Sequence, residues 1–344
     1  MRSIIPILLL LLSVSLSGQS LSQRDLEYYE SQNSLFTKEI EAIFDTLTPG
    51  YHSTERVRAL HMVDAITHYP FPHDDQLKGM FLNRYRKSVQ DISKAEVRGG
   101  AVAWNIYNMS YVVKTPEIIV AFDIIRLPDS LRKENEEDIH KQLVKELVEQ
   151  CDLLFVSHIH QDHADPYVAG EFLRQGKQVI APSGVFKNED FYDRICHLER
   201  SGKKVRMEVP STGTGISVRI YPGHQAIAAD AAVDNNFTVL TLPNHITVAH
   251  SGDQAWGDDF SWLDHIYKEV NIDLLMVNTW TADPVRLIRG LQPKTVLPGH
   301  INEMSHGISG RISYWRSYLT WKPAACEVVH LFWGESYHYE KKND

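Results

Sequence analysis

The seven residues 157–163, which read Ser-His-Ile-His-Gln-Asp-His, constrain the fold of this 344-residue chain more than any other segment. They contain four side chains of kinds that bind metals: His158, His160, Asp162 and His163. The run follows the apolar residues 153–156, whose composition predicts a short buried strand. The potential ligands therefore lie at the end of a strand and in the loop after it, where a rigid scaffold can hold functional groups. Imidazole and carboxylate donors without a thiolate suit Zn, Fe, Mn or Ni.

Three later segments end in the same way. Residues 216–221, 246–249 and 295–297 each read as a strand, and a loop with glycine follows each at once. These loops supply three more potential ligands: His224, Asp253 and His300. A glycine beside each ligand allows the backbone to turn sharply and to approach closely. If these strand ends share one edge of a layered core, the ligands converge on a single site.

The ligand pattern resembles the metallo-β-lactamase superfamily, whose signature is His158-x-His160-x-Asp162-His163 followed by later ligands in this order. Three further segments look most like the lactonase-like branch, which includes ascorbate-phosphate lactonase: residues 104–118, 250–253 and 298–300. The resemblance covers about residues 97–335. It implies a fold of the α/β (α+β) class, a four-layer αββα sandwich with the site along one sheet edge.

The resemblance also implies a centre of two divalent metal ions, with zinc expected and manganese or iron as alternatives. His158, His160 and His224 would bind the first ion. Asp162, His163 and His300 would bind the second, and Asp253 would bridge the two. Asp123, after the apolar run 118–122, stands where the family has an aspartate that organises the motif loop, although it could also simply end a strand. His250 ends its predicted strand and is expected to orient a ligand, whereas His245 is expected to face solvent from a hairpin turn.

Residues 300–306 contain two more ionisable side chains, Glu303 and His306, beyond the predicted ligand His300. They do not form a zinc-protease motif, because that motif needs the glutamate next to its first histidine. Glu303 and His306 either orient His300 or contact substrate, or they cap and solvate the segment that follows.

Two metal ions roughly 3.5–4 Å apart can share a water, lower its pKa towards about 7 and hold hydroxide ready for attack. Asp162 has a spare carboxylate oxygen that can orient this hydroxide or accept its proton, so it is the predicted catalytic residue. The pattern thus favours a metal-dependent hydrolase that acts on a small molecule with an ester, lactone, amide or phosphodiester bond. An iron-containing oxidoreductase of the same fold is the alternative.

Two further functions are less favoured by the same residues. A metal-stabilised binding protein without turnover would not need all seven ligand positions, and every one of them is filled. A β-lactamase proper fits poorly with the lactonase-like segments and with the long helical front of the chain. A net charge of −9 with no basic stripe argues against nucleic acid as a partner.

The chain divides into three parts by composition. Residues 1–20 carry one cation, a short apolar run and small residues near position 18, which is the layout of a secretory signal peptide and predicts export to the periplasm or medium. Residues 21–96 read as helices, and residues 97–344 form the predicted metallo-β-lactamase-fold domain. No later stretch is long enough to span a bilayer. The helices are expected to cap the main domain or to form a homo-oligomer surface.

Apolar spacing places individual elements. It predicts helices at 54–67, 75–94, 130–150 and 260–270. It also predicts single strands at 101–113 and 117–125, joined by a turn at residues 114–116.

Overall fold

The computed structural model describes residues 23–50, 53–68, 75–133, 135–225 and 232–341, so the predicted signal peptide lies outside the described residues. The helices are α1 (Gln23–Thr46), α2 (Thr54–Thr67), α3 (Asp75–Lys94), α4 (Glu137–Gln150), α5 (Pro166–Arg174), α6 (Phe260–Leu263), α7 (Pro284–Leu291) and α8 (Tyr314–Trp321). The strands are β1 (Ala101–Tyr107), β2 (Ser110–Lys114), β3 (Ile119–Phe122), β4 (Leu153–Phe155), β5 (Gln178–Ile180), β6 (Val205–Val209), β7 (Thr214–Gln225), β8 (Val233–Thr241), β9 (Thr247–His250), β10 (Leu274–Asn278), β11 (Thr295–Gly299), β12 (Glu327–Val328) and β13 (Glu335–Tyr339).

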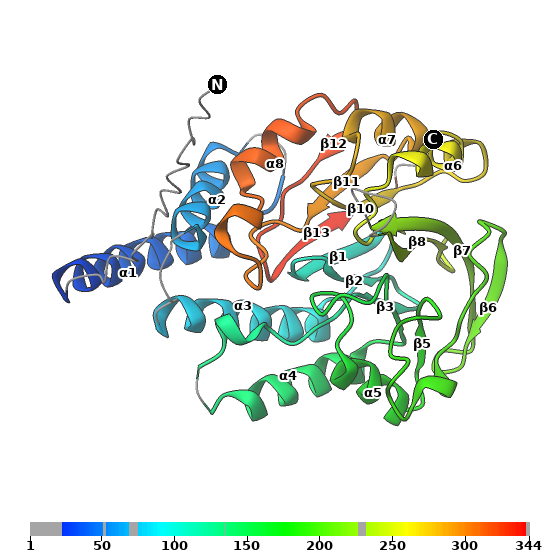
Figure 1. Cartoon of the computed structure of the whole chain (residues 1–344), viewed down its shortest axis with the longest axis horizontal. Coiled ribbons are helices and arrows are strands. Elements are labelled where there is room, and N and C mark those ends of the chain that lie inside the picture. The colour runs from blue at the N-terminus through cyan, green and yellow to red at the C-terminus, as the bar shows by residue number, and fades with distance from the viewer. Residues whose placement is uncertain (1–22, 51–52, 69–74, 134, 226–231, 342–344) are drawn as a thin grey trace, which may run out of the picture.

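The strands form two mixed sheets (Figure 1). The first has the order β13-β1-β2-β3-β4-β5, and the second has the order β12-β11-β10-β9-β8-β7-β6. β3, β4 and β5 are parallel to one another, as are β9, β10 and β11. Parallel strands end at the same edge of a sheet. The loops after β9 and β11 therefore lie at one edge of the second sheet, and the contact of His163 with Asp253 places the loop after β4 next to them.

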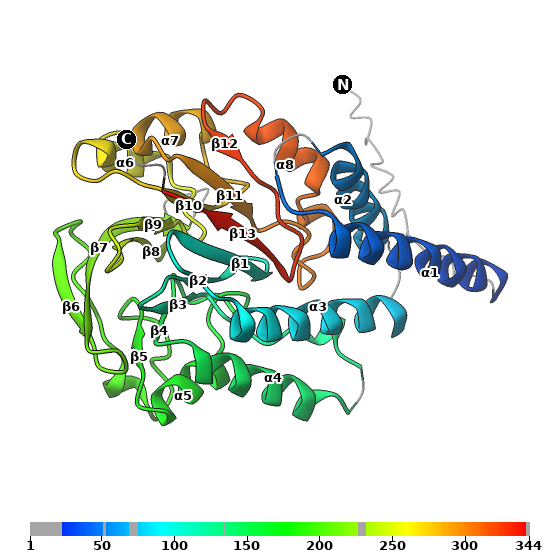
Figure 2. The same cartoon turned by 180° about the vertical axis from the view of Figure 1, so that it is seen from behind.

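Three clusters of buried side chains fill the spaces between the layers of the molecule. Side chains of both sheets, such as Tyr111 and Leu297, fill the space between the sheets. A second cluster joins α3, α4 and α5 to the outer face of the first sheet, and a third joins α6 and α7 to the second sheet. Figures 1 and 2 show these helices on opposite outer faces. The predicted four-layer αββα sandwich is confirmed.

The N-terminal helices α2 and α3 belong to the same core as the first sheet. Residues 54–67 and 75–94 form α2 and α3 with the predicted bounds. Their apolar side chains, among them Leu60 of α2 and Phe81 of α3, lie in one cluster with Trp104 of β1. α3 packs on β1, and α2 packs on α8. These helices thus cover part of a sheet face.

The structure corrects three element predictions. The expected strand 101–113 is a hairpin, because Asn108 takes a left-handed φ of 52° between β1 and β2. This conformation suits asparagine better than most residues. The expected helix 260–270 ends its α-helical part at Leu263, and the helix expected at 130–150 begins only at Glu137. Within the described residues, no helix is long and apolar enough to cross a membrane.

Candidate metal centre

The motif loop is held by a buried carboxylate at the end of the neighbouring strand. Asp123 follows β3, and its Oδ1 accepts a hydrogen bond from the backbone N of Ser157 at 2.6 Å. Its Oδ2 accepts from Ser157 Oγ at 2.6 Å and lies 2.7 Å from Nδ1 of His163. Burial opposes ionisation, but the imidazoles of His250 and His163 and the Ser157 hydrogen bond hold the pKa of Asp123 below its usual range. The predicted loop-organising position of Asp123 matches this geometry.

A first group of donors lies at the start of the motif. His158 Nε2 is 3.0 Å from His160 Nδ1 and 3.7 Å from Asp253 Oδ2. Burial, followed by the neighbouring His163, lowers the pKa of His158 to about 3. The ring therefore stays neutral, which is the form that binds a metal ion.

A second group of donors shares the same carboxylate. It consists of Asp162, His163, Asp253 and His300, three of which are fully buried. Nε2 of His163 lies 3.4 Å from Asp162 Oδ2 and 3.2 Å from Asp253 Oδ2. Nε2 of His300 lies 3.3 and 3.4 Å from the same two oxygens. Asp253 thus belongs to both groups, which is where a bridging ligand must lie.

These separations fit a metal ion. Ligand atoms about 2.1 Å from a tetrahedral ion lie about 3.4 Å from one another. In addition, three donor atoms of the second group are buried and make no hydrogen bond within the described part of the chain: His163 Nε2, His300 Nε2 and Asp253 Oδ1. Buried polar atoms without a partner are costly. Burial alone would lower the pKa of His300, but Asp253 and Asp162 raise it to about 10. A bound cation would therefore displace a proton from His300.

His224 is the one predicted ligand that the structure does not bring into either group. It lies within β7, with its side chain one-third exposed. Asp259 holds it, since Oδ2 accepts from the His224 backbone N at 2.8 Å and Oδ1 lies 2.9 Å from its Nδ1. Nε2 of His224 is 4.0 Å from Asp234 Oδ1. The contact with Asp259 leaves Nε2 as the free ligand atom, and the role of His224 stays a prediction.

His250 and His245 lie where the sequence places them. His250 ends β9, and its Nε2 is 2.9 Å from the carbonyl oxygen of Met109. Its Nδ1 accepts from the backbone N of Gly252 at 3.2 Å. Burial lowers the pKa of His250, so the ring is neutral. Through its contact with Gly252, the ring stabilises the turn that carries Asp253. His245 is exposed in its turn.

Two asparagines were missed by the sequence analysis. Asn108 in the β1–β2 turn donates from Nδ2 to Asp162 Oδ2 at 3.2 Å. Asn235 of β8 accepts at Oδ1 from the backbone N of Asp253 at 3.0 Å and donates to Ser251 O at 2.8 Å. Both side chains are fully buried. Asn108 interrupts an apolar, strand-like run and Asn235 lies between two polar residues, and neither pattern says what the side chain contacts.

The contacts of Glu303 match the capping alternative. Its carboxylate accepts hydrogen bonds from Tyr107 at 2.7 Å, from the Ser305 hydroxyl at 2.7 Å and from the His306 backbone N at 2.8 Å. It therefore caps the segment that follows. Asp162, Glu303 and His306 also place donor atoms within 4.8 Å of one another. Because these hydrogen bonds occupy the lone pairs of Glu303, a third metal ion is disfavoured there.

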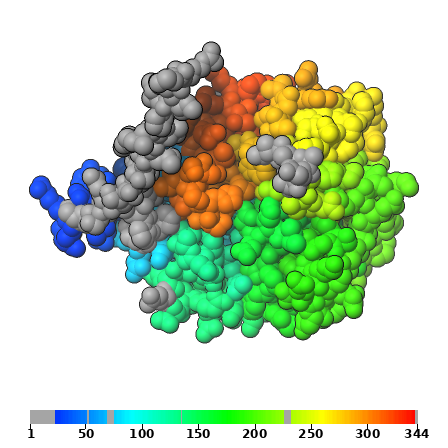
Figure 3. All heavy atoms as spheres, viewed as in Figure 1, coloured from blue at the N-terminus to red at the C-terminus, as the bar shows by residue number. Residues whose placement is uncertain are grey.

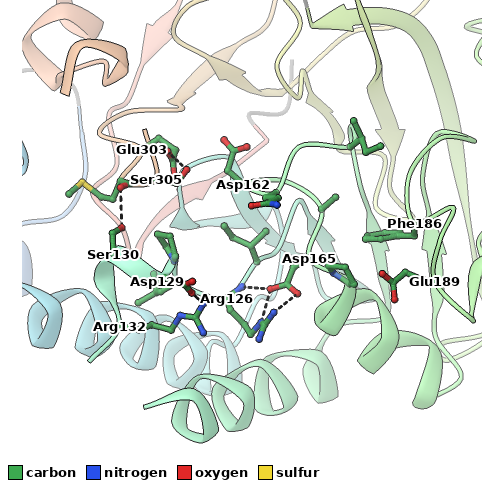
Figure 4. Close-up of a pocket in the computed structure, with 18 of the residues that line it drawn as sticks. Arg126, Asp129, Ser130, Arg132, Asp162, Asp165, Phe186, Glu189, Glu303 and Ser305 are labelled. Carbon is green, nitrogen blue, oxygen red and sulfur yellow. Dashed lines mark hydrogen bonds and ion pairs between the residues drawn. The ribbon is translucent and has the colours of Figure 1, made fainter. Parts of the chain in front are cut away.

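A cavity of about 890 Å³ opens beside Asp162. Asp162 and Glu303 lie on one side of it, and Arg126, Asp129 and Arg132 lie across from them (Figure 4). In the space-filling view, the segment near residue 300 and the teal and green segments that form the rest of the wall lie on one face of the molecule (Figure 3). The volume suits a small molecule.

Arg126, Arg132 and Lys187 are the basic residues of the cavity wall, and the two arginines form ion pairs. Arg126 forms ion pairs with Asp165 at 2.8 Å and with Glu137 at 2.6 Å. Arg132 pairs with Asp129 and with the same Glu137. Apolar wall residues lie between these pairs: Ile125, Leu127, Ile159, Ala164, Phe186 and Met304. The cavity therefore offers apolar surface next to the donor groups and little net positive charge.

No protein-family model matches the chain, and a search of curated proteins found no significant match. Solved structures do resemble it. A metallohydrolase from the hyperthermophilic archaeon Ignicoccus hospitalis aligns with a TM-score of 0.52 and 16% identity, over 70% of this chain and 99% of that one. An isothiocyanate hydrolase from Delia radicum gut bacteria aligns with a TM-score of 0.52 and 12% identity, over 70% of this chain and 99% of that one. At such low identity the likeness concerns the fold. Together with the layer order, it shows that the chain adopts the metallo-β-lactamase fold.

Proposed function

We propose that this protein is a metal-dependent hydrolase with two divalent ions, zinc being the expected metal. The supporting observation is the pair of donor groups that share Asp253, with three buried donor atoms left without a hydrogen bond. His158 and His160 would hold one ion and Asp162, His163 and His300 the other. Such an ion pair, when bound, supplies a water with a lowered pKa and a Lewis acid for the oxygen of the scissile group.

Asp162 is the proposed catalytic residue. Its Oδ2 faces His163 and His300 and accepts the Asn108 hydrogen bond. Its Oδ1 is left to accept the proton that the attacking water loses. Burial raises the pKa of Asp162, but His163 and His300 outweigh it and hold that pKa well below its usual range. The carboxylate is therefore ionised, which is the form that binds a metal ion and can orient the attacking water.

The cavity wall suggests what kind of substrate fits. Since Arg126 and Arg132 are already paired, a substrate body with a second anionic group would gain little there. Ile159 is 52% exposed at the motif, and Phe186 lies in the same wall. We expect an ester, lactone, amide or phosphodiester whose remaining part is uncharged and partly apolar. Lactones are the first compounds to test, because of the resemblance to the lactonase-like branch.

Elemental analysis of natively purified protein, followed by a panel of these four bond types, tests the proposal. We expect two ions per chain and hydrolysis that chelation abolishes. Asp162→Asn should lower kcat by about 10²–10⁴-fold, whereas Asp138→Asn, at an exposed position of α4, should leave it unchanged. Full activity of Asp162→Asn would exclude the proposed mechanism. Stoichiometric iron with oxygen-dependent turnover would favour the oxidoreductase instead, and a nitrocefin assay tests for a β-lactamase.

We also propose that the protein is exported. The support is the layout of residues 1–20, with a single cation before an apolar run and small residues after it. Determining the N-terminus of the protein from its native cells checks this. A mature chain that begins near residue 19–21 is expected, and a chain that retains Met1 in the cytoplasm would contradict it.

A further inference from the structure

The loop that carries His300 has an unusual backbone conformation. His300 and Asn302 both have left-handed φ angles, of 55° and 54°. Few non-glycine residues adopt this conformation, although histidine and asparagine do so more readily than most. Both residues are buried, and Asn302 is fully inaccessible. A contact that holds Asn302 in place therefore helps to keep the loop in the conformation that directs His300 towards the donor groups.

That contact comes from α2, far away in the sequence. Asp64 Oδ1 accepts a hydrogen bond from Asn302 Nδ2 at 2.9 Å and another from the backbone N of Tyr314 at 2.7 Å. Asp64 Oδ2 accepts from the backbone N of Trp315 at 3.1 Å. The N-cap residue of α8, Ser313, makes no capping hydrogen bond of its own. One carboxylate of α2 thus caps α8 and fixes the side chain two residues beyond His300.

Further contacts tie the same loop to the end of α2. Arg311 donates to the carbonyl oxygen of Thr67 at 2.5 Å and to that of His306 at 2.9 Å. Ile301 and Met304, on either side of the Asn302–Glu303 pair, belong to the buried cluster that contains the apolar face of α2. The loop after β11 therefore packs against α2 through both polar and apolar contacts.

We infer that Asp64 is a positioning residue for the second metal ion, acting through Asn302 on His300. The N-terminal helices α2 and α3 then do more than cover a sheet, because α2 helps to support the metal centre. This inference rests on the proposed two-ion function. Partners that orient a metal ligand typically contribute 10–100-fold to metal affinity when mutated. Since Asp64 acts through one intervening residue, we expect about a tenfold effect, confined to one of the two ions.

Two variants and a matched control test the inference. Asp64→Ala removes the acceptor of the Asn302 hydrogen bond and of the two α8 backbone hydrogen bonds. Asn302→Gly removes the side-chain hydrogen bond while tolerating the left-handed backbone. Arg56→Met is the control, because Arg56 is also buried on α2 but bonds Glu335 rather than the His300 loop. Zinc content after dialysis against metal buffers and the thermal midpoint are measured for each full-length protein.

We expect wild type and Arg56→Met to retain two zinc ions, although Arg56→Met melts at a lower temperature. Asp64→Ala and Asn302→Gly should retain one ion at wild-type affinity and bind the other about tenfold more weakly. The double variant should bind zinc no more weakly than either single variant, since both single variants remove the Asp64–Asn302 hydrogen bond. If Asp64→Ala does not fold, Asn302→Gly carries the test.

Different outcomes separate this inference from the proposed function. If wild type binds two ions and both variants bind two with unchanged affinity, the inference is wrong and the proposed function stands. If wild type binds no metal ion, both are wrong. Equal weakening of zinc binding in Arg56→Met would also overturn the inference, because it would show that any loosening of α2 has this effect.

Discussion

Gly252 lies between two residues that hold the metal centre, Asn235 and Ser157. A Cβ at this position would stand 2.2 Å from Asn235 Oδ1 and 2.5 Å from Ser157 Cβ, and its φ is 51°. Asn235 holds the backbone of Asp253, and Ser157 bonds Asp123, so neither can move without moving a predicted ligand or its support. Gly252 therefore allows the close approach of backbone and ligand loops that the sequence predicts, because an added Cβ would have no space there.

Gly252→Ala should for this reason destabilise the fold by several kcal/mol and reduce zinc content. Gly213→Ala separates the causes, because Gly213 also has a left-handed φ, of 65°, but no atom within 4 Å of the added Cβ. We expect about 1–2 kcal/mol for Gly213→Ala from backbone strain alone and no change in bound metal. Chemical unfolding and elemental analysis of both variants check this. Equal losses of unfolding free energy and of bound zinc in the two variants would contradict the steric explanation.

At the scale of elements, α2 is locked to the start of β13 by a buried ion pair. Arg56 donates to both carboxylate oxygens of Glu335, at 2.5 and 2.7 Å, and its guanidinium lies over the Phe44 ring. Glu335 also accepts from the backbone N of Phe332 at 2.8 Å. The carboxylate would be left buried without a cation if Arg56 were removed.

Arg56→Met is therefore expected to lower the free energy of unfolding by about 3–5 kcal/mol, the usual loss when one partner of a buried ion pair is removed. Arg56→Met combined with Glu335→Gln should recover part of this loss, because the amide still accepts from Phe332 and no unpaired charge remains. Urea unfolding of the two variants measures the difference. A double variant less stable than Arg56→Met would show that the charge is not the cause.

Elements with a strong helical period could be located from sequence, and elements defined by their partners could not. α2 and α3 have periodic apolar residues and clear ends, so their bounds were predictable. The β1–β2 hairpin was missed because residues 101–113 are apolar almost throughout, and its turn is made by Asn108, whose side chain bonds Asp162. α8 begins where Asp64 caps it, and that carboxylate lies about 250 residues away in the sequence.

At the scale of the whole molecule, buried histidines make stability depend on pH. Burial, followed by the nearby Arg56, lowers the pKa of His330 from 6.5 to about 3. The unfolded chain therefore binds a proton below about pH 6.5, whereas the folded protein does not until about pH 3. The unfolded state holds more protons in this window. The contribution of the neutral His330 to the free energy of unfolding is therefore complete above pH 6.5 and is lost as the pH falls towards 3.

His330→Gln should make this loss shallower, because glutamine can keep the contact with Ser317 Oγ at 2.9 Å but does not titrate. The free energy of unfolding of the metal-free protein at pH 7 and at pH 4.5 gives the slope for each form. His265→Gln, at an exposed position, is the control and should keep the wild-type slope. If the free energy of unfolding of His330→Gln depends on pH as steeply as that of wild type, His330 is not the cause of the loss.

The sequence by itself determined the fold class and the residue types of the centre, because ligands that end strands leave a pattern readable along the chain. The order of the ligands and the family resemblance also led to the prediction that Asp253 and His300 lie close to His163. Only the tertiary structure decided that Asn108, Asn235 and Asp64 support these ligands and that His224 stands apart from both donor groups. The physical reason is that such support consists of single hydrogen bonds between segments far apart in sequence. Those bonds depend on the packed positions of whole elements, and no local pattern records them.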